Sequence, residues 1–294
     1  MSSIIGHEGV CTQLERILQL SDIPQSFLFG GPKHVGKQTV AAWFAYRLLG
    51  LSSQGEVASS DIIIIEPEKS VTTKQTREKA IAVQEVRSLK QFLSRSPGSG
   101  KYRIAIINQA EKLSPAAADA LLKILEEPPK QSVLMLLTSQ PQHLPSTILS
   151  RMVAFSLRPV SATTLRNSLP ESKELPQFFL DLGLPGLIID ALSQPENFLE
   201  QKECLRKLFQ ISKLSQRARI EFAEYLSKNE TETRDLLEIW TVGILFQART
   251  QGIAQSQGRN RYVLLHSILT ALRSLSRNEG SSRSILERLL VSCP

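Results

Sequence analysis

The sequence predicts an α/β domain with a parallel sheet, followed by helical units. Three observations support this prediction. Short apolar runs alternate with helical patterns up to about residue 160, which is typical of a parallel sheet layered between helices. Beyond that residue the strand pattern ends, and helical spacing continues with breaks at proline and glycine. A glycine-rich turn, residues 31–39, joins the first apolar run to a helical pattern.

Five apolar runs predict the strands of the first unit. They lie at residues 26–31, 60–68, 102–110, 132–140 and 152–157. The second run holds four consecutive isoleucines, 62–65, which are typical of a strand covered on both faces. Helical patterns lie between the runs, at residues 36–50, 80–94 and 114–129. We expect Ser114 to cap the last of these helices and Pro115 to occupy its first position.

The second half of the chain is expected to be helical. Short helices broken by proline and glycine extend to about residue 200. Longer helical patterns follow, at residues 198–214, 219–229, 233–252, 260–278 and 282–293. The sequence therefore predicts three units, with boundaries at 1–160, 161–203 and 204–294.

Composition narrows the class of protein. The chain has 294 residues, 41% of them hydrophobic, which is enough for a real core. No apolar run approaches the length of a transmembrane helix, and the first residues lack a signal-peptide pattern, so we expect a soluble cytoplasmic protein. Three scattered cysteines form neither a disulfide framework nor a zinc site. The net charge of +7 is compatible with a nucleic-acid or acidic partner and equally with an evenly solvated basic surface.

Residues 31–39, GPKHVGKQT, match the phosphate-binding loop G-x-x-x-x-G-K-[ST] except at its final position. Gly31 and Gly36 supply the permissive turn, and Lys37 is placed to reach the phosphates of a nucleotide. Gln38 stands where a hydroxyl would hold Mg²⁺. Thr39 does not replace that hydroxyl, because the next helical residue points about 100° away. The loop is compatible with ATP, with ADP and with an empty site.

A second departure lies at the end of the third strand. Active ATPases with this loop end that strand in an Asp that holds Mg²⁺ and a Glu that orients water, whereas this chain has Asn108 and Gln109. Catalysis of phosphoryl transfer is chiefly electrostatic and positional, so the loss of both carboxylates should remove most of it. We expect Glu111 to start the following turn rather than replace them.

Four stretches of the first half carry a family resemblance: IIGHEGVCTQLERIL, FLFGGPKHVGK, ALLKILEEPP and LLTSQPQHLPSTILSR. They resemble bacterial clamp-loader subunits of the AAA+ class, and the delta-prime group within that family fits best. The resemblance covers roughly residues 1–160. It implies an AAA+ domain, a small helical lid domain and an all-helical collar domain. It also implies a five-subunit ring that loads a sliding clamp onto primed DNA, with ATP bound between neighbouring subunits.

The resemblance also implies a role for Ser150 and Arg151. In the family a Ser-Arg-Cys motif supplies an arginine finger to the nucleotide of the adjacent subunit. Here Ser150 and Arg151 keep the motif, and Met152 replaces its cysteine. A rigid, permanently charged guanidinium suits the γ-phosphate oxygens, so we expect the finger to be retained. The alternative is a surface arginine in an ion pair.

Other positions carry weaker expectations from the resemblance. Thr138 or Ser139 would occupy a first sensor position, and Gly186 stands where a second sensor arginine is expected. The four-cysteine zinc module of some relatives is absent from residues 49–65. DNA contact near the start of the helix at 80–94 would involve Arg77 and Lys79, although a solvated surface explains both residues equally well.

Together these features predict a non-hydrolysing clamp-loader subunit that requires no cofactor and no metal. Its expected partners are the gamma/tau ATPase subunits, the delta subunit, the sliding clamp and primed DNA through the assembled ring. Two alternatives stay open: an active or weakly active ATPase of gamma/tau type, and a nucleotide-binding regulator outside replication.

Overall fold

A computed structural model describes residues 4–51, 60–72, 75–98, 100–168, 177–193, 195–250, 255–277 and 279–293. The chain divides into two compact units. The first comprises Met1–Ser70 and Glu78–Val160, and the second comprises Val71–Arg77 and Ser161–Pro294. The further division of the second unit into a lid and a collar near residue 203 stays a prediction.

A five-stranded parallel sheet forms the centre of the first unit, in the order β2-β5-β6-β1-β7. The strands are β1 (Ser26–Gly30), β2 (Ile62–Ile65), β5 (Arg103–Ile107), β6 (Ser132–Thr138) and β7 (Val153–Ser156). Every residue of β1 and β6 is buried. The expected strands are all present, and their parallel pairing brings the chain segments that follow them to one edge of the sheet, here called the carboxyl edge.

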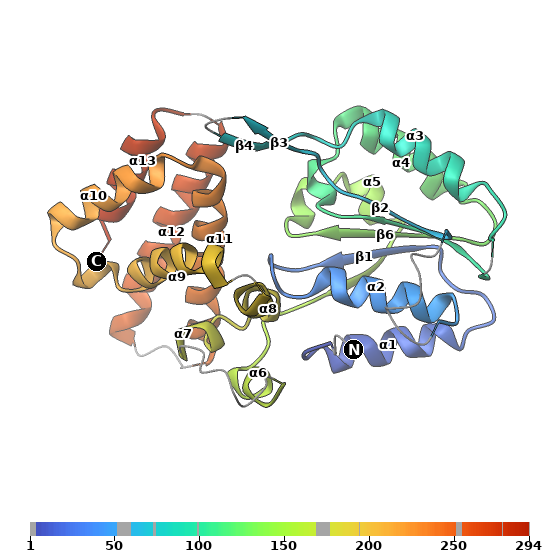
Figure 1. The fold of residues 1–294 in the computed structure, drawn as a ribbon, viewed down its shortest axis with the longest axis horizontal. Coiled ribbons are helices and arrows are strands. Elements are labelled where there is room, and N and C mark those ends of the chain that lie inside the picture. Colours follow the sequence, from blue (N-terminus) through green and yellow to red (C-terminus); the bar gives the residue numbers. More distant parts are fainter. Residues whose placement is uncertain are drawn as a thin grey trace. The chain divides into compact units, whose positions relative to one another are not determined.

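Helices cover both faces of this sheet, with α3, α4 and α5 on one face and α1 and α2 on the other (Figure 1). Their bounds are α1 (Glu8–Leu18), α2 (Lys37–Leu48), α3 (Val83–Leu93), α4 (Pro115–Glu126) and α5 (Ser146–Leu149). Short 3₁₀ turns lie at Ala110–Lys112 and Pro141–His143. The fold is therefore the layered α/β domain that the sequence predicts.

The start of α4 confirms the predicted cap. Ser114 Oγ accepts a hydrogen bond of 3.2 Å from the backbone N–H of Ala117, and Pro115 occupies the first turn. Caps of this kind typically stabilise a helix by about 1 kcal/mol. Leu121 and Ile124 on the inner side of α4 are buried in the core between the helices and the sheet. The cap thus begins the helix at the register that buries these side chains.

The four isoleucines of β2 are not covered on both faces, so that prediction was wrong. Ile65 is buried, but the side chain of Ile64 is 47% exposed. The reason is the position of β2 at the edge of the sheet, where only β5 pairs with it. The run of isoleucines reflects β-propensity as much as burial.

The helix expected at 80–94 begins later than predicted. Ile81 is fully buried and forms an isolated parallel β-bridge with Leu113 outside the named strands, so it precedes the helix. The α3 helix starts at Val83, where the carboxylate of Glu85 accepts a 2.7 Å hydrogen bond from the N–H of Ala82. A two-stranded sheet of β3 (Lys69–Thr72) and β4 (Gln75–Glu78), which the sequence patterns did not predict, precedes this helix.

A buried carboxylate fixes the loop before β5. Asp61 is fully buried and accepts hydrogen bonds from the N–H groups of Gly98 (2.7 Å) and Gly100 (3.1 Å). Arg103 Nη2 lies 3.8 Å from the same carboxylate, and its guanidinium stacks over the Phe92 ring at 4.7 Å. The charge is therefore compensated, as a buried carboxylate requires.

The second unit is helical over its described residues from 161 onward. Its helices are α6 (Ala162–Ser168), α7 (Gln177–Leu180), α8 (Pro185–Ser193), α9 (Pro195–Phe209), α10 (Gln216–Ser227), α11 (Glu230–Thr250), α12 (Gln255–Arg277) and α13 (Ser282–Val291), with a 3₁₀ turn at Ile211–Lys213. These agree with the predicted helical patterns to within a few residues at their ends. Among the described residues no helix is both long and apolar enough to cross a bilayer.

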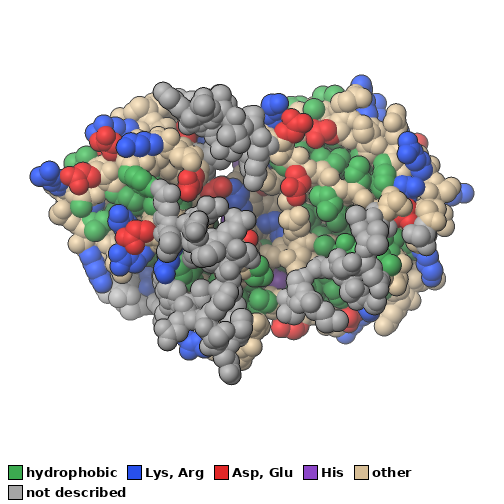
Figure 2. Space-filling model, in the orientation of Figure 1, with side chains coloured by type: hydrophobic (Ala, Val, Ile, Leu, Met, Phe, Trp, Pro, Cys, Tyr) green, Lys and Arg blue, Asp and Glu red, His purple; other side chains and the backbone are tan. Residues whose placement is uncertain are grey.

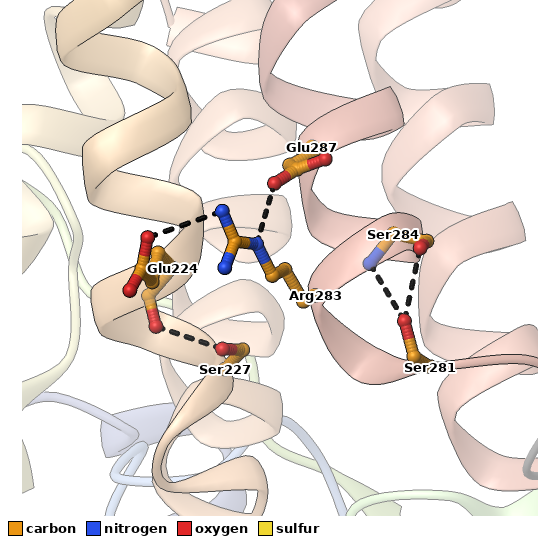
Figure 3. Close-up of polar contacts among 6 residues, drawn as sticks. All are labelled: Glu224, Ser227, Ser281, Arg283, Ser284 and Glu287. Atoms are coloured by element: carbon orange, nitrogen blue, oxygen red, sulfur yellow. Dashed lines mark hydrogen bonds and ion pairs between the residues drawn. The ribbon is translucent and has the colours of Figure 1, made fainter.

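Helices α10 and α13 pack against each other through apolar side chains, and an arginine links them at the surface. Figure 3 shows Arg283 between Glu224 of α10, at 3.1 Å, and Glu287 of its own helix, at 2.8 Å. Ser281 caps the start of α13, since its Oγ accepts from the N–H of Ser284. Because the ion pairs are exposed, the apolar contact supplies most of the stabilisation.

Candidate functional site

The glycine-rich loop connects β1 to α2 at the carboxyl edge of the sheet. A Cβ atom added at Gly31 would lie 2.5 Å from the carbonyl oxygen of Leu157, so only glycine fits there. Gly36 has φ of 103° and precedes the first residue of α2, Lys37. The N-terminus of α2 therefore faces the loop, in the arrangement that suits an anion.

The loop holds the side chain of its own lysine. Lys37 Nζ donates hydrogen bonds of 2.8 Å to the carbonyl oxygens of Gly31 and Pro32. His7 also ties the loop down, because its ring nitrogen Nε2 lies 2.8 Å from the carbonyl oxygen of Val35. The contacts of Lys37 and His7 thus fix the backbone of the loop that would bind a phosphate.

A carboxylate joins two predicted site residues. Gln38 Nε2 donates to Glu66 Oε1 at 3.3 Å, and Asn108 Nδ2 donates to the same oxygen at 3.2 Å. Glu66 follows β2 directly, and Asn108 follows its partner strand β5, with Ile65 and Ile107 in register. The structure thus brings the loop and the end of β5 together through a third residue, Glu66, which the motif positions do not identify.

The amide of Asn108 is held in one orientation. Its Oδ1 accepts a hydrogen bond of 3.0 Å from the N–H of Gln109, while its Nδ2 donates to Glu66. Gln109 adopts a left-handed backbone, φ 51° and ψ 52°, and starts the 3₁₀ turn that follows. Thr39 lies one residue beyond Gln38 on α2.

These donors do not fit the magnesium ion that the fold family implies. The hydroxyl and the two carboxylates expected of such a site are Gln38, Asn108 and Gln109 in this chain. Gln38 and Asn108 direct N–H groups at a carboxylate, and magnesium requires oxygen ligands at about 2.1 Å in near-octahedral geometry. No step of a reaction is therefore assigned to a metal at this place.

Glu111 contacts the end of β6. Ser139 donates to Glu111 Oε1 from its hydroxyl at 2.6 Å and from its N–H at 3.3 Å. Burial raises the pKa of Glu111, but hydrogen bonds from Ser139, from its own backbone and from Thr138 outweigh that effect and hold the pKa below its usual value. Glu111 lies in the turn, as expected, and it also anchors the predicted first-sensor positions.

Arg151 lies at the opposite edge of the sheet from the loop. It comes two residues before β7, whose first residue, Val153, pairs with Phe27 near the start of β1. The loop follows the end of β1, and five residues of strand span about 15 Å. Arg151 therefore lies at the amino edge, where strands begin, and does not serve the loop of its own chain.

The side chain of Arg151 is exposed and paired. Its Nη2 lies 3.1 Å from Glu126 Oε1, and its Nη1 donates to the carbonyl oxygen of Thr147 at 3.0 Å. Ser150 caps the end of α5 through its hydroxyl, which donates to the same carbonyl oxygen. Met152 packs against the hydrophobic core behind the arginine. The ion pair matches the alternative interpretation of Arg151 and leaves its guanidinium accessible.

The remaining predicted positions are scattered. Gly186 lies in α8 of the second unit, and Lys79 forms an exposed ion pair with Glu68 at 3.3 Å before α3 begins. The side chain of Arg77 and part of the segment at 49–65 lie outside the described residues. On the face drawn in Figure 2, basic side chains of the described residues are interspersed with acidic ones.

Sequence reasoning missed Glu66 and Glu126, two carboxylates that contact predicted site residues. Glu66 had a usable signal, because it directly follows a strand that ends at the same edge as the loop. Glu126 had a weaker sequence signal, because its contact with Arg151 depends on the end of α4 lying beside α5 in the folded chain.

The sequence of this chain is similar to those of DNA polymerase III subunits. A family model described as DNA polymerase III, delta subunit, matches residues 6–161. DNA polymerase III subunit tau of Escherichia coli (strain K12) is 30% identical over 183 residues, covering 57% of this chain and 27% of that protein. DNA polymerase III subunit delta' of Pseudomonas aeruginosa is 33% identical over 135 residues, covering 44% of this chain and 41% of that protein.

The chain thus spans about a quarter of the length of this tau relative and under half of the delta' relative. Among solved structures, a DNA polymerase III gamma subunit-related protein of Thermotoga maritima aligns with a TM-score of 0.57 at 21% identity. That alignment covers 95% of this chain and 96% of the other. At this identity the likeness concerns the fold alone.

Proposed function

The chain belongs to the AAA+ clamp-loader family of DNA polymerase III, and we propose that within it the chain is a non-hydrolysing, delta-prime-like subunit that supplies an arginine finger to a neighbour. In this role it helps an assembled loader place a sliding clamp on primed DNA. The matched region is only part of the tau and delta' relatives. The role of this chain in an assembled loader is therefore part of the proposal.

The position of Arg151 is the observation that carries this proposal. Its guanidinium is exposed at the amino edge of the sheet, about 15 Å of strand away from the loop of its own chain. A finger there acts only on a nucleotide bound to another subunit. The loop at the carboxyl edge, meanwhile, has lost the ligands that an active site needs.

The chemistry of the finger follows from the side chain. A guanidinium presents rigid, permanently charged N–H groups that fit the oxygens of a transferring phosphoryl group. In this assembly Arg151 would leave Glu126 for the γ-phosphate of the neighbour, where it stabilises the charge that develops in the transition state. Both acceptors are anionic, so the exchange keeps the arginine paired.

The proposed partners follow from the family. They are the gamma/tau ATPase subunits, the delta subunit, the sliding clamp and primed DNA enclosed by the ring, and the place of action is the cytoplasm. ATP or ADP at the chain's own loop is not required for this role.

A reconstituted loader tests the finger. We expect Arg151→Ala to slow single-turnover ATP hydrolysis at the neighbouring site by at least about 100-fold. Arg151→Lys should not rescue it, because an ammonium lacks the planar fork. Arg95→Ala is the matched control, since Arg95 is another exposed arginine between a helix and the strand that follows it. Equal rates for Arg151→Ala and Arg95→Ala would refute the proposal.

A gamma/tau-type ATPase is the second candidate, and one observation favours it. The chain matches a tau subunit over a longer stretch than the delta' subunit and keeps Lys37 in its loop. This candidate predicts turnover by the isolated chain that Lys37→Ala abolishes. A regulator outside replication predicts instead that Arg151→Ala leaves the partner's ATP hydrolysis unchanged.

A further inference from the structure

Glu66 lies between two sequence positions whose side chains hold the metal in active phosphate-binding loops. Residue 38 follows the lysine of the loop, and residue 108 directly follows β5, which is the third strand of the parallel sheet in chain order. One oxygen, Glu66 Oε1, lies 3.3 Å from Gln38 Nε2 and 3.2 Å from Asn108 Nδ2. The exposed carboxylate of Glu66 therefore lies between the two positions that hold a divalent cation in an active site.

The two amides are arranged to hold this carboxylate. Asn108 would have to rotate its amide to offer an oxygen to a cation. That rotation would break the hydrogen bond from the N–H of Gln109 to Oδ1 and turn an NH₂ group toward that N–H. The orientation of the Asn108 amide thus favours an anionic acceptor and disfavours a cation, and Gln38 donates to the same carboxylate oxygen.

A nucleoside triphosphate brings its own negative charge to this place. In loops of this class the β- and γ-phosphates lie at the N-terminus of the helix, beside the metal. Here they would meet the carboxylate of Glu66 without a metal between them. Like charges at short range disfavour such a complex, and the repulsion is stronger near a protein surface than in bulk water.

We propose that Glu66 takes the place of the metal and is the residue that excludes a nucleoside triphosphate from this loop. The inference deepens the proposed function and rests on it in one respect, that the loop is not an active ATPase site. Glu66 would repel this ligand. The replacement of the usual metal ligands by Gln38 and Asn108 would remove an attraction but would not by itself repel the nucleotide.

Binding of ATP to the purified full-length chain tests this proposal. Isothermal titration calorimetry with excess Mg²⁺ and with EDTA would compare wild-type protein, Glu66→Gln and Glu66→Ala. The control is Glu68→Gln, which removes an exposed carboxylate two residues away that pairs with Lys79. A double variant, Glu66→Ala with Lys37→Ala, checks that any gain in affinity arises at the loop.

We expect wild-type protein to bind ATP weakly, with affinities in Mg²⁺ and in EDTA that differ by less than about threefold. Glu66→Gln and Glu66→Ala should each bind ATP at least about tenfold more tightly, as loss of one close like-charge contact implies. Glu68→Gln should match wild type, and the double variant should lose the gain.

Two results would overturn the proposal. Tighter ATP binding by wild type in Mg²⁺, lost in Glu66→Gln, would make Glu66 a metal ligand. No gain in either Glu66 variant over Glu68→Gln would remove its role in exclusion. Because these measurements use the isolated chain and leave Arg151 intact, they are independent of the finger, which is tested in the assembly.

Discussion

Arg151 Nη2 lies 3.1 Å from Glu126 Oε1, in an ion pair whose two side chains are 39% and 53% exposed. Pairs this exposed typically contribute between about 0 and 1 kcal/mol, because solvent screens them. The pair therefore positions the guanidinium at the amino edge of the sheet without binding it tightly. An arginine held this way is available to a stronger anion.

Glu126→Ala should leave both stability and function nearly intact. The free energy of unfolding is expected to change by less than about 1 kcal/mol, measured by urea denaturation. The reconstituted loader should keep its ATP hydrolysis rate, since the arginine remains. A rate as low as that of Arg151→Ala would mean that Glu126 itself acts in the reaction.

Asp61→Ala should destabilise the first unit strongly. The substitution leaves the N–H groups of Gly98 and Gly100 without their acceptor and Arg103 without a nearby buried carboxylate. We expect a loss of about 3 kcal/mol in the free energy of unfolding, measured by urea denaturation. The exposed Asp22→Ala is the control and should change it by less than about 0.5 kcal/mol. Similar losses for both would contradict the described network.

Arg219→Ala should loosen the end of α13. Arg219 Nη1 donates to the carbonyl oxygens of Leu290 (3.3 Å), Val291 (3.4 Å) and Cys293 (2.8 Å), so it caps that helix from α10. Its loss should weaken the last turn by about 1 to 2 kcal/mol, seen as faster amide hydrogen exchange there.

Arg217→Ala provides the matched control for this cap. Arg217 lies on the same helix but forms only an exposed ion pair with Glu221. Its removal should leave exchange in α13 unchanged. If both variants gave equal protection in α13, Arg219 would not be its cap.

The stability of the second unit should fall at high pH through Cys293. Burial raises the pKa of this thiol from 9.0 to about 11, with Arg219 opposing the shift. Between these values the folded state holds a proton that the unfolded state has lost. The stabilisation is therefore complete below pH 9 and falls by about 2 kcal/mol as the pH approaches 11.

Urea unfolding at pH 8 and pH 11, followed by circular dichroism, measures this dependence. Cys293→Ala should be less stable than wild type at pH 8 but should lose less stability on the way to pH 11. An unchanged pH dependence in that variant would show that other groups cause the loss.

Local sequence patterns predicted the elements well where one segment determines the outcome. The cap at Ser114, the loop with Gly31 and Gly36, and the buried β6 all follow from residues that are adjacent in the chain. Positions that depend on topology were harder. The exposure of Ile64 depends on β2 being an edge strand, which the isoleucine run does not reveal.

The candidate site divides in the same way. The residue types at positions 38 and 108 can be read from the motif alone, but the link through Glu66 depends on β2 and β5 being neighbours. The pairing of Arg151 with Glu126 likewise depends on how α4 and α5 pack. A pattern search tests residues against expected ligands and does not consider a carboxylate that stands in for the ion.

One comparison tests the central claim most directly, namely that this chain assists hydrolysis at a neighbouring subunit and performs none itself. It is the ATP hydrolysis rate of loaders reconstituted with Arg151→Ala or with Lys37→Ala in this chain alone. We predict a rate within about twofold of wild type for Lys37→Ala and loss of hydrolysis at the neighbouring site for Arg151→Ala. The reverse pattern, loss with Lys37→Ala and a normal rate with Arg151→Ala, would contradict the account.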